Sequence, residues 1–215
     1  MNNHNKLVAD QYDIIYKEFD TSRVRIWNCV KEFLNNTNVN ETLLDCGCGN
    51  GKNMIYAKAL GYKCKGFDIS MKLLNICKEK DLDVFYNDIL NINLNENYNK
   101  IISIAVLHHL ETINEQQIAI DIMLKHLKPG GKLLVSFWSH EKSYNKNGNN
   151  KSDTRDFIVG PNYVDWKLNK NNVIKRYYYI HDFNSIETLA KKFNIKYDII
   201  WEMQNWFITF HKKMK

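Results

Sequence analysis

Apolar residues recur along the chain at two different spacings, and the spacing changes with position. Between residues 7 and 35 they fall at helical intervals, which predicts N-terminal helices over 7–19 and 23–35. Beyond residue 40, short apolar runs alternate with amphipathic segments. The runs predict strands over 42–46, 63–68, 83–88, 100–106 and 132–138. The segments between them predict helices over 50–60, 70–80 and 115–127.

The order strand, helix, strand is typical of parallel βαβ units, whose helices cover both faces of a buried sheet. After residue 175 the pattern predicts a strand over 176–181, a helix over 185–193, and last strands over 195–203 and 205–213. Gln204 and Asn205 can turn one of these last strands into the other. We therefore predict an α/β, Rossmann-like fold with a mostly parallel seven-stranded sheet, helices on both faces and a C-terminal antiparallel hairpin.

Residues 139–172 interrupt this order. They are rich in Asn, Lys, Ser and Asp, which predicts a long polar insertion loop. Its cations and one aromatic suit an RNA backbone and a splayed base, with a solvated insertion as the alternative. These residues are Lys142, Tyr144, Lys146, Lys151 and Arg155. The length suits one domain over 1–215, with a helical prelude over 1–40.

The composition narrows the function without fixing it. The net charge of +6 permits a polyanionic partner but does not require one. Hydrophobic residues make up 44% of the chain, which is enough for a core and excludes a wholly disordered protein. No apolar run approaches the roughly 18 residues of a membrane helix, so we expect no membrane partner. The first residues also lack the pattern of a secretory signal.

The five cysteines are odd in number and irregular in spacing. Cys46 and Cys48 flank a glycine in a predicted tight turn, which is poor geometry for zinc. We expect all five to be buried small residues and no metal site. We also expect a reducing compartment, the cytoplasm, with the nucleus as the alternative.

The most informative segment is LLDCGCGNGKN, residues 43–53. A buried strand delivers Asp45, and Gly47, Gly49 and Gly51 then form a turn into a helix. Glycines let the backbone bend sharply there and let a ligand approach without meeting Cβ atoms. The segment therefore predicts a nucleotide-cofactor site.

Further candidates follow at the ends of the next strands. Asp68 lies about twenty residues beyond the turn, where an acid can bond both hydroxyls of a ribose. Asp88 can reach an adenine amino group, with Ile89 beside the ring. Ile69 and Ala105 complete the candidate cofactor set. Acids at three successive strand ends indicate an adenosine-containing cofactor.

Two cofactor classes compete for such a site. A nicotinamide fingerprint reads G-x-G-x-x-G/A and needs a small residue where this chain has Lys52. The glycines here read G-x-G-x-G, which is the methyltransferase spacing. We therefore expect S-adenosyl-L-methionine, and the predicted sheet with its final hairpin is the class I methyltransferase arrangement.

Several segments carry a resemblance to one family. The chain resembles the tRNA methyltransferases that convert 5-carboxymethyluridine at the wobble position to its methyl ester. It is similar to their stand-alone form and to the methyltransferase half of the AlkB-like tRNA hydroxylases. The matching segments are VADQYDIIYKEFDTSRVRIW (8–27), LLDCGCGNGK (43–52), ISIAVLHHL (102–110), LKPGGKLLVSFW (127–138), EKSYNK (141–146), DFIVGPNYVDWKL (156–168), RYYYIH (176–181) and NWF (205–207).

The resemblance implies an S-adenosylmethionine-dependent tRNA O-methyltransferase. A carboxylate is already ionised at neutral pH, so the transfer needs positioning and removal of water rather than a general base. Arg23 is the first catalytic candidate, because its forked donors suit a carboxylate or phosphate. The alternative for Arg23 is a surface arginine on a helix. His108 and His109 end the strand predicted over 100–106, and we expect one of them to contact substrate.

Tryptophans and polar residues complete the candidate substrate site. Trp27 can stack on a base and Trp138 can wall the pocket, with core packing as the alternative for both. The resemblance implies substrate roles for Arg176, Asn205 and Trp206. A simple turn residue is the alternative for Asn205.

The resemblance also implies partners, namely a tRNA anticodon loop and a small zinc-binding activator subunit. That subunit would form a heterodimer and cover the edge strand predicted over 83–88, since an uncovered edge invites pairing. Two other functions stay open: a class I methyltransferase acting on a small molecule, and a catalytically silent scaffold of the same fold. A redox Rossmann enzyme is disfavoured by Lys52.

Overall fold

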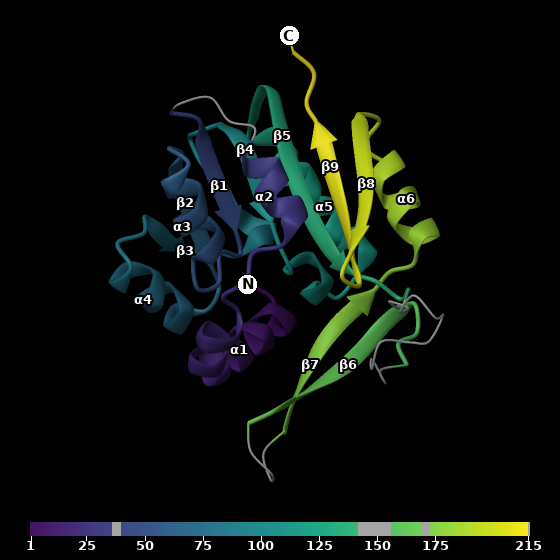
Figure 1. The fold of residues 1–215 in the computed structure, drawn as a ribbon. Helices are drawn as coiled ribbons and strands as arrows, with labels where there is room; N and C mark the ends of the chain where they lie inside the picture. The colour runs from purple at the N-terminus through teal and green to yellow at the C-terminus, as the bar shows by residue number, and fades with distance from the viewer. Residues whose placement is uncertain (36–39, 142–155, 169–172, 215) are drawn as a thin grey trace, which may run out of the picture.

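The computed structural model describes residues 1–35, 40–141, 156–168 and 173–214 (Figure 1). The helices along these residues are α1 (Asn3–Ser22), α2 (Asn28–Asn35), α3 (Lys52–Ala59), α4 (Met71–Glu79), α5 (Ile113–Lys125) and α6 (Phe183–Lys191), with 3-10 turns η1 (Ile89–Asn91) and η2 (Leu107–His109). The strands are β1 (Thr42–Cys46), β2 (Lys63–Asp68), β3 (Val84–Tyr86), β4 (Tyr98–Ser103), β5 (Leu127–Trp138), β6 (Gly160–Lys167), β7 (Val173–Ile180), β8 (Lys196–Glu202) and β9 (Asn205–His211).

The main sheet has seven strands in the order β3-β2-β1-β4-β5-β9-β8. Neighbouring strands are parallel from β3 to β5, and β9 runs antiparallel to both β5 and β8. This arrangement confirms the predicted fold class, including the C-terminal antiparallel hairpin and the edge position of the strand predicted over 83–88.

The central strand β4 shows why the sequences of the middle strands are continuous apolar runs: its side chains are buried on both faces of the sheet. Successive side chains of a strand point to opposite faces, and Ile101 and Ile102 are both fully buried. Ile101 packs in the cluster that holds the buried residues of α5 and α6. Ile102 packs with Val30 of α2 and Ala57 of α3. Helices therefore cover both faces of the sheet, as Figure 1 shows.

The N-terminal helices differ from the prediction at their junction. Residues 23–27 form a non-helical connection between α1 and α2, so the helix predicted over 23–35 is wrong in its first turn. The beginning of α2 is fixed by Glu202 of β8, whose carboxylate accepts the backbone N–H groups of Asn28 and Cys29. A helix N-terminus needs such acceptors. Because Glu202 is distant in sequence, local patterns could not locate this boundary.

The strand predicted over 100–106 is also shorter than expected. β4 ends at Ser103, and Ala105 takes a positive φ of 61° that turns the chain into η2. His108 and His109 therefore lie on a 3-10 turn beyond the strand, which corrects their predicted position at its end. The apolar run was misleading because it continues through the turn, where Leu107 is itself part of the core.

A second, two-stranded sheet falls within the predicted insertion loop. β6 pairs antiparallel with β7 in a register that places Trp166 beside Ile174, Val164 beside Arg176, and Asn162 beside Tyr178. The prediction of a loop is thus wrong over Gly160–Lys167, and β7 begins earlier than the strand predicted over 176–181. The strand was hidden by the surrounding polar composition and by Pro161, Asn162 and Asp165 within it. The candidate RNA-binding residues Lys142, Tyr144, Lys146, Lys151 and Arg155 lie outside the described residues.

The turn between β8 and β9 is made by Met203 and Gln204, with positive φ of 47° and 61°, so Asn205 is the first residue of β9 rather than a turn residue. All five cysteines are free, and all but Cys64 are buried. Within the described ranges, no helix is long and apolar enough to cross a membrane. In the same ranges, no group of three His, Cys, Asp or Glu side chains is arranged to hold a metal ion.

Candidate functional site

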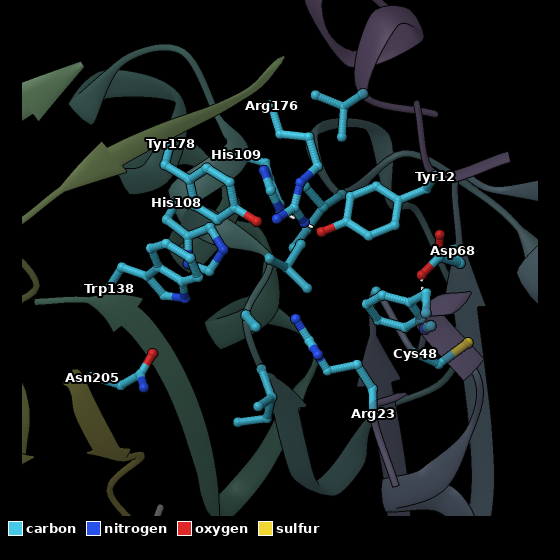
Figure 2. Close-up of a pocket in the computed structure, with 18 of the residues that line it drawn as sticks. Tyr12, Arg23, Cys48, Asp68, His108, His109, Trp138, Arg176, Tyr178 and Asn205 are labelled. Atoms are coloured by element: carbon cyan, nitrogen blue, oxygen red, sulfur yellow. Dashed lines mark hydrogen bonds between the residues drawn. The ribbon is translucent and has the colours of Figure 1, made fainter. Parts of the chain in front are cut away.

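A pocket of about 390 Å³ opens at the carboxyl ends of the parallel strands (Figure 2). Its lining comes from the turn after β1, the end of β2, the turns η1 and η2, and the end of β5. Side chains of α1 and β7 close it from the other side. Open α/β sheets bind their ligands at this edge because the loops that follow the strands converge there.

Most of the predicted site residues line this pocket. From the cofactor set they are Gly47, Gly49, Asp68, Ile69, Asp88, Ile89 and Ala105. From the catalytic and substrate sets they are Arg23, Trp27, His108, His109, Trp138, Arg176 and Asn205. Asp45, Gly51 and Trp206 do not line it.

Two of the exceptions support the walls of the pocket. Gly51 is the N-cap of α3 with a φ of 77°, and a Cβ atom there would lie 2.2 Å from Leu82 Cδ1. It therefore permits close packing rather than ligand approach. Trp206 donates from Nε1 to the carboxylate of Glu141 at 2.9 Å, and its ring packs against Phe183. Neither Gly51 nor Trp206 lines the pocket, so a direct role toward a ligand stays a prediction for both.

The third exception, Asp45, is a buried carboxylate without a partner. It is 1% exposed, and neither carboxylate oxygen has a hydrogen-bond partner among the described residues. Burial, and next the charge of Asp68, raise the pKa of Asp45 to about 8, while Lys52 acts in the opposite direction. Burying such a group without donors is costly. The site is therefore suited to a ligand that brings a positive charge or N–H donors close to the turn after β1.

The turn after β1 is held open by backbone hydrogen bonds. The N–H groups of Gly47 and Cys48 both donate to the carbonyl oxygen of Phe67 on β2, at 2.8 and 2.9 Å. Asp68 accepts from the N–H groups of Gly49 and Ser70. These bonds fix the Asp68 carboxylate at the pocket wall, where an acid can meet ribose hydroxyls.

Asp88 is already engaged by α1. Its two carboxylate oxygens accept from the side-chain amide of Asn5, at 3.1 and 3.0 Å, and one also accepts from the Leu90 N–H. Each carboxylate oxygen has further lone pairs, so Asp88 still fits its predicted role toward an adenine amino group. α1 is thus part of the site, which the sequence pattern did not indicate.

His109 is locked in one protonation state. Its Nδ1 lies 2.9 Å from the Tyr177 carbonyl oxygen, which only accepts, so Nδ1 carries the proton. Burial lowers the pKa of His109 to about 3, so the ring is neutral and Nε2 accepts. The Tyr12 hydroxyl, 2.8 Å from Nε2, therefore donates to His109 (Figure 2). Both ring nitrogens are used within the protein, so His109 orients Tyr12 rather than reaching a ligand.

His108 has the opposite arrangement. Its ring stacks on Tyr178, with centroids 4.8 Å apart, and Nδ1 has no hydrogen-bond partner among the described residues. Burial, and next the charges of His109 and Arg176, hold the pKa of His108 well below its usual value. His108 is therefore a neutral hydrogen-bonding group at the pocket wall. Of the two histidines, it is the one with a free nitrogen to offer.

Arg176 is the buried cation of the site. It is 5% exposed, and its Nε has no partner among the described residues. Its guanidinium lies 4.6 Å from the ring centroid of Trp166 and 5.1 Å from that of Tyr178. Arg23 approaches from the opposite side of the pocket (Figure 2), 5.3 Å from the same Trp166 ring. Such stacking suits the planar guanidinium group and leaves its donors available to an anion.

Other predicted substrate residues form the remaining walls. Trp138 stacks on Tyr178 with centroids 4.2 Å apart, and Trp27 meets Phe207 edge-on at 5.4 Å. Asn205 donates to the Met203 carbonyl oxygen, and its own side-chain oxygen is buried without a partner. Each residue therefore packs in the wall and also faces the pocket.

Sequence reasoning missed three aromatic residues of the site. Tyr12 lies in the helix predicted over 7–19 and in the segment over 8–27 that carries the family resemblance, but neither pattern indicated its contact with His109. Tyr178 and Trp166 belong to the hairpin that was interpreted partly as a loop. The alternation in β6 was the available signal for Trp166, since Asn162, Val164 and Trp166 share one face.

A family model described as "Methyltransferase domain" matches residues 21–194. Among curated relatives, a tRNA (carboxymethyluridine(34)-5-O)-methyltransferase of Arabidopsis thaliana is 38% identical over 140 residues, which are 64% of this chain and 34% of the relative. The protein of the same printed name, ALKBH8, of Macaca fascicularis is 35% identical, over 65% of this chain and 21% of the relative. The chain therefore spans only about a third or a fifth of these relatives. In Schizosaccharomyces pombe, a protein of that name is 29% identical over 77% of this chain and 70% of the relative.

Solved structures establish the same fold at low identity. The DhpI–SAM–HEP complex has a TM-score of 0.73 and 11% identity, and the comparison covers 97% of this chain and 99% of that chain. SAM-bound CalS10, an amino pentose methyltransferase from Micromonospora echinaspora, has a TM-score of 0.65 and 13% identity, with 93% and 97% covered. At these identities the likeness concerns the fold alone.

Proposed function

The chain belongs to the methyltransferase-domain family, and from this membership we propose that it uses S-adenosyl-L-methionine to methyl-esterify the carboxylate of 5-carboxymethyluridine at the tRNA wobble position. The names of the relatives support this substrate. The structural observation that carries the proposal is Arg176, a buried guanidinium without an ion-pair partner among the described residues, at the pocket wall. Such a cation fits a substrate carboxylate.

The residues near the glycine turn fit the cofactor. S-adenosyl-L-methionine carries an ammonium and a sulfonium, and when bound it supplies the methyl group. The unpartnered carboxylate of Asp45 would be neutralised by such positive charge. Asp68 would bond the ribose, Asp88 and Ile89 would meet the adenine, and the glycine turn leaves room for close approach.

The other half of the pocket would hold the acceptor. Arg176 would orient the carboxylate through its fork of donors, and His108 would hydrogen-bond the uracil from its unpartnered nitrogen. No proton has to be removed, because the carboxylate is ionised at neutral pH. Neutral histidines suit this chemistry, since they position the base without competing for the negative charge. The aromatic walls exclude water, which favours the meeting of opposite charges.

A pH dependence follows from Asp45. In the chain alone its pKa is about 8, so the group is mostly protonated near neutral pH. A bound cation favours the ionised form, so cofactor binding should release a proton and tighten as pH rises from about 6 to 8. Asp45→Asn should weaken binding roughly 100-fold and remove this pH dependence, since about 3 kcal/mol is typical for a lost bond between charged groups. Calorimetry in buffers of different ionisation enthalpy measures both effects.

The raised pKa of Asp45 also predicts how the stability of the cofactor-free chain depends on pH. Asp45 holds its proton in the folded state up to about pH 8 but loses it near pH 4 when unfolded. The free energy of unfolding therefore falls as pH rises between these values. Asp45→Asn should flatten that fall, as measured by urea unfolding at pH 5 and pH 8. An unchanged slope in the variant would show that Asp45 is already ionised in the folded chain.

We also propose a partner and a setting. A small zinc-binding activator subunit would cover the edge strand β3, where Tyr86 is 48% exposed, and would make the active species a heterodimer. An open strand edge offers unpaired backbone groups to such a subunit. The expected setting is the cytoplasm.

The proposal is tested by methyl transfer to tRNA. The full chain, with and without an activator subunit, is incubated with labelled S-adenosyl-L-methionine and tRNA that carries 5-carboxymethyluridine. Digestion to nucleosides should place base-labile label on the wobble uridine, because a methyl ester is hydrolysed by base. Label that resists base, or label found only on small metabolites, would contradict the proposed substrate.

A further inference from the structure

Arginine is used selectively in this chain. Of the 30 lysine and arginine residues, only four are arginines. The three that the structure describes, Arg23, Arg25 and Arg176, all line the pocket. Within the described ranges none of them lies within ion-pair distance of a carboxylate, whereas several lysines do. In a lysine-rich chain, unpaired arginines gathered at one pocket point to an anionic ligand, because their planar fork matches carboxylate and phosphate.

The three arginines lie at different depths. Arg176 is buried, whereas Arg23 and Arg25 are exposed at the mouth of the pocket. A single anion cannot account for both depths, because a carboxylate bound to the buried Arg176 lies inside the pocket and not at its mouth. Figure 2 shows Arg23 reaching toward the pocket from the side opposite Arg176. Arg23 and Arg25 therefore face the part of a ligand that remains outside the pocket.

The surroundings of the exposed pair are positive and aromatic. Lys52 donates from Nζ to the Arg25 carbonyl oxygen at 2.9 Å and lies 5.7 Å from the ring centroid of Trp27. The guanidinium of Arg23 lies over Trp166. Burial, and next the charge of Arg23, lower the pKa of Lys52, so the cations here repel one another. An added anion would relieve that repulsion.

The nearby carboxylates have other partners. Asp20 is bound by Lys80 and by the side chain of Asn50. Glu202 caps α2 through the N–H groups of Asn28 and Cys29, although its charge is close enough to Arg25 to interact with it. Among the described residues, neither Arg23 nor Arg25 therefore has a carboxylate within ion-pair distance.

We propose that Arg23 and Arg25 form a phosphodiester-binding rim, which holds the RNA backbone on either side of a nucleotide whose base lies in the pocket, with Trp27 as a stacking surface for a neighbouring base. This rests on the proposed function. A base that is turned out of its stack into a deep pocket leaves its phosphates at the mouth. Cations interleaved with aromatic rings suit single-stranded RNA there. The rim differs in role from Arg176, which takes the carboxylate.

A series of substrates separates these roles. Four proteins are compared: the unmodified chain, Arg23→Gln, Arg25→Gln and Lys63→Gln. Each is assayed for methylation of 5-carboxymethyluridine, of its 5′- and 3′-monophosphates, and of an anticodon stem-loop that carries this nucleoside. Lys63 is an exposed control at the amino end of β2, the opposite end of the sheet. For the unmodified chain, the KM of the better monophosphate should be about 10-fold below that of the nucleoside, since one charged contact contributes a factor of this size. In at least one rim variant that ratio should fall to about 1, and in Lys63→Gln it should be unchanged.

RNA binding gives a second measurement that needs no methyl transfer. The affinity for the stem-loop is measured against salt concentration, and the slope of log affinity against log salt should become shallower by about 0.7 in each rim variant. A rim variant that lowers methylation of nucleoside and monophosphate by the same factor, with an unchanged salt slope, would place that arginine on the carboxylate and overturn the rim. If the unmodified chain methylates none of these substrates, with or without the activator subunit, the proposed function fails, and the salt slopes still decide the rim.

Discussion

Arg176→Gln is expected to lower kcat/KM for carboxylate methylation by about 30- to 3000-fold, while the affinity for the cofactor stays the same. The side chain is 5% exposed, and its guanidinium is stacked between the rings of Trp166 and Tyr178. Without it, a substrate carboxylate would enter the pocket with no cation to balance the loss of water. Removing one partner of a buried charge pair costs about 2–5 kcal/mol, and the stated range corresponds to a loss of about 2 to 4.7 kcal/mol.

Two further variants test whether the lost kcat/KM is due to the guanidinium group of Arg176. Arg176→Lys keeps the charge but loses the flat guanidinium and its stacking on Trp166, so it should recover only part of the activity. Lys175→Gln is the matched control, because Lys175 is the preceding residue of β7 and is exposed. Initial rates, cofactor calorimetry and thermal melting are measured for all three. Full activity in Arg176→Gln, with an unchanged melting temperature, would refute the carboxylate site.

Gly47→Ala is expected to reduce cofactor affinity by at least about 100-fold and to destabilise the chain. Gly47 has a φ of 80°, and a Cβ atom there would lie 2.4 Å from Val106 Cγ2. The left-handed backbone alone costs an alanine about 1–2 kcal/mol. The contact adds a forced shift of the turn, whose N–H groups are bonded to Phe67 of β2. A displaced turn would no longer follow the cofactor closely.

Gly61→Ala provides the control for the backbone effect. Gly61 also has a positive φ, of 93°, but a Cβ atom there would meet nothing within 4 Å. It should lose about 1–2 kcal/mol of stability and no cofactor affinity. Adding Val106→Ala to Gly47→Ala should recover part of the affinity, because it removes the methyl groups that the new Cβ meets. Equal affinities for Gly47→Ala and Gly61→Ala, measured by calorimetry, would show that the turn does not need to be free of side chains.

The arrangement of the site also explains why two adjacent histidines differ in their hydrogen bonding. His109 uses both of its ring nitrogens on Tyr177 and Tyr12, whereas His108 has an unpartnered nitrogen at the pocket wall. The sequence indicated that one of the pair would contact substrate but not which one. Neighbouring side chains on a short 3-10 turn point in different directions. Their hydrogen-bond partners are therefore set by the elements around the turn.

The sequence by itself determined the fold class and the place of the candidate cofactor residues at one edge of the sheet. Strands and glycines act locally: an apolar run of five or six residues predicts a buried strand, and the G-x-G-x-G turn follows directly from β1. Because parallel strands all end at one edge, Asp68 and Asp88 were expected at the same place without knowledge of any contact. The order along the chain was sufficient for this part.

The arrangement of the candidate substrate residues was decided by the tertiary structure. Tyr12 meets His109 across 97 positions of sequence, and Arg23 and Arg176 meet at the ring of Trp166, a residue in a segment predicted to be a loop. Asn5 reaches Asp88 in the same way, across 83 positions. Such contacts depend on where α1 and the β6–β7 hairpin pack against the sheet. That placement results from the packing of whole surfaces, which no local pattern of apolar and polar residues encodes.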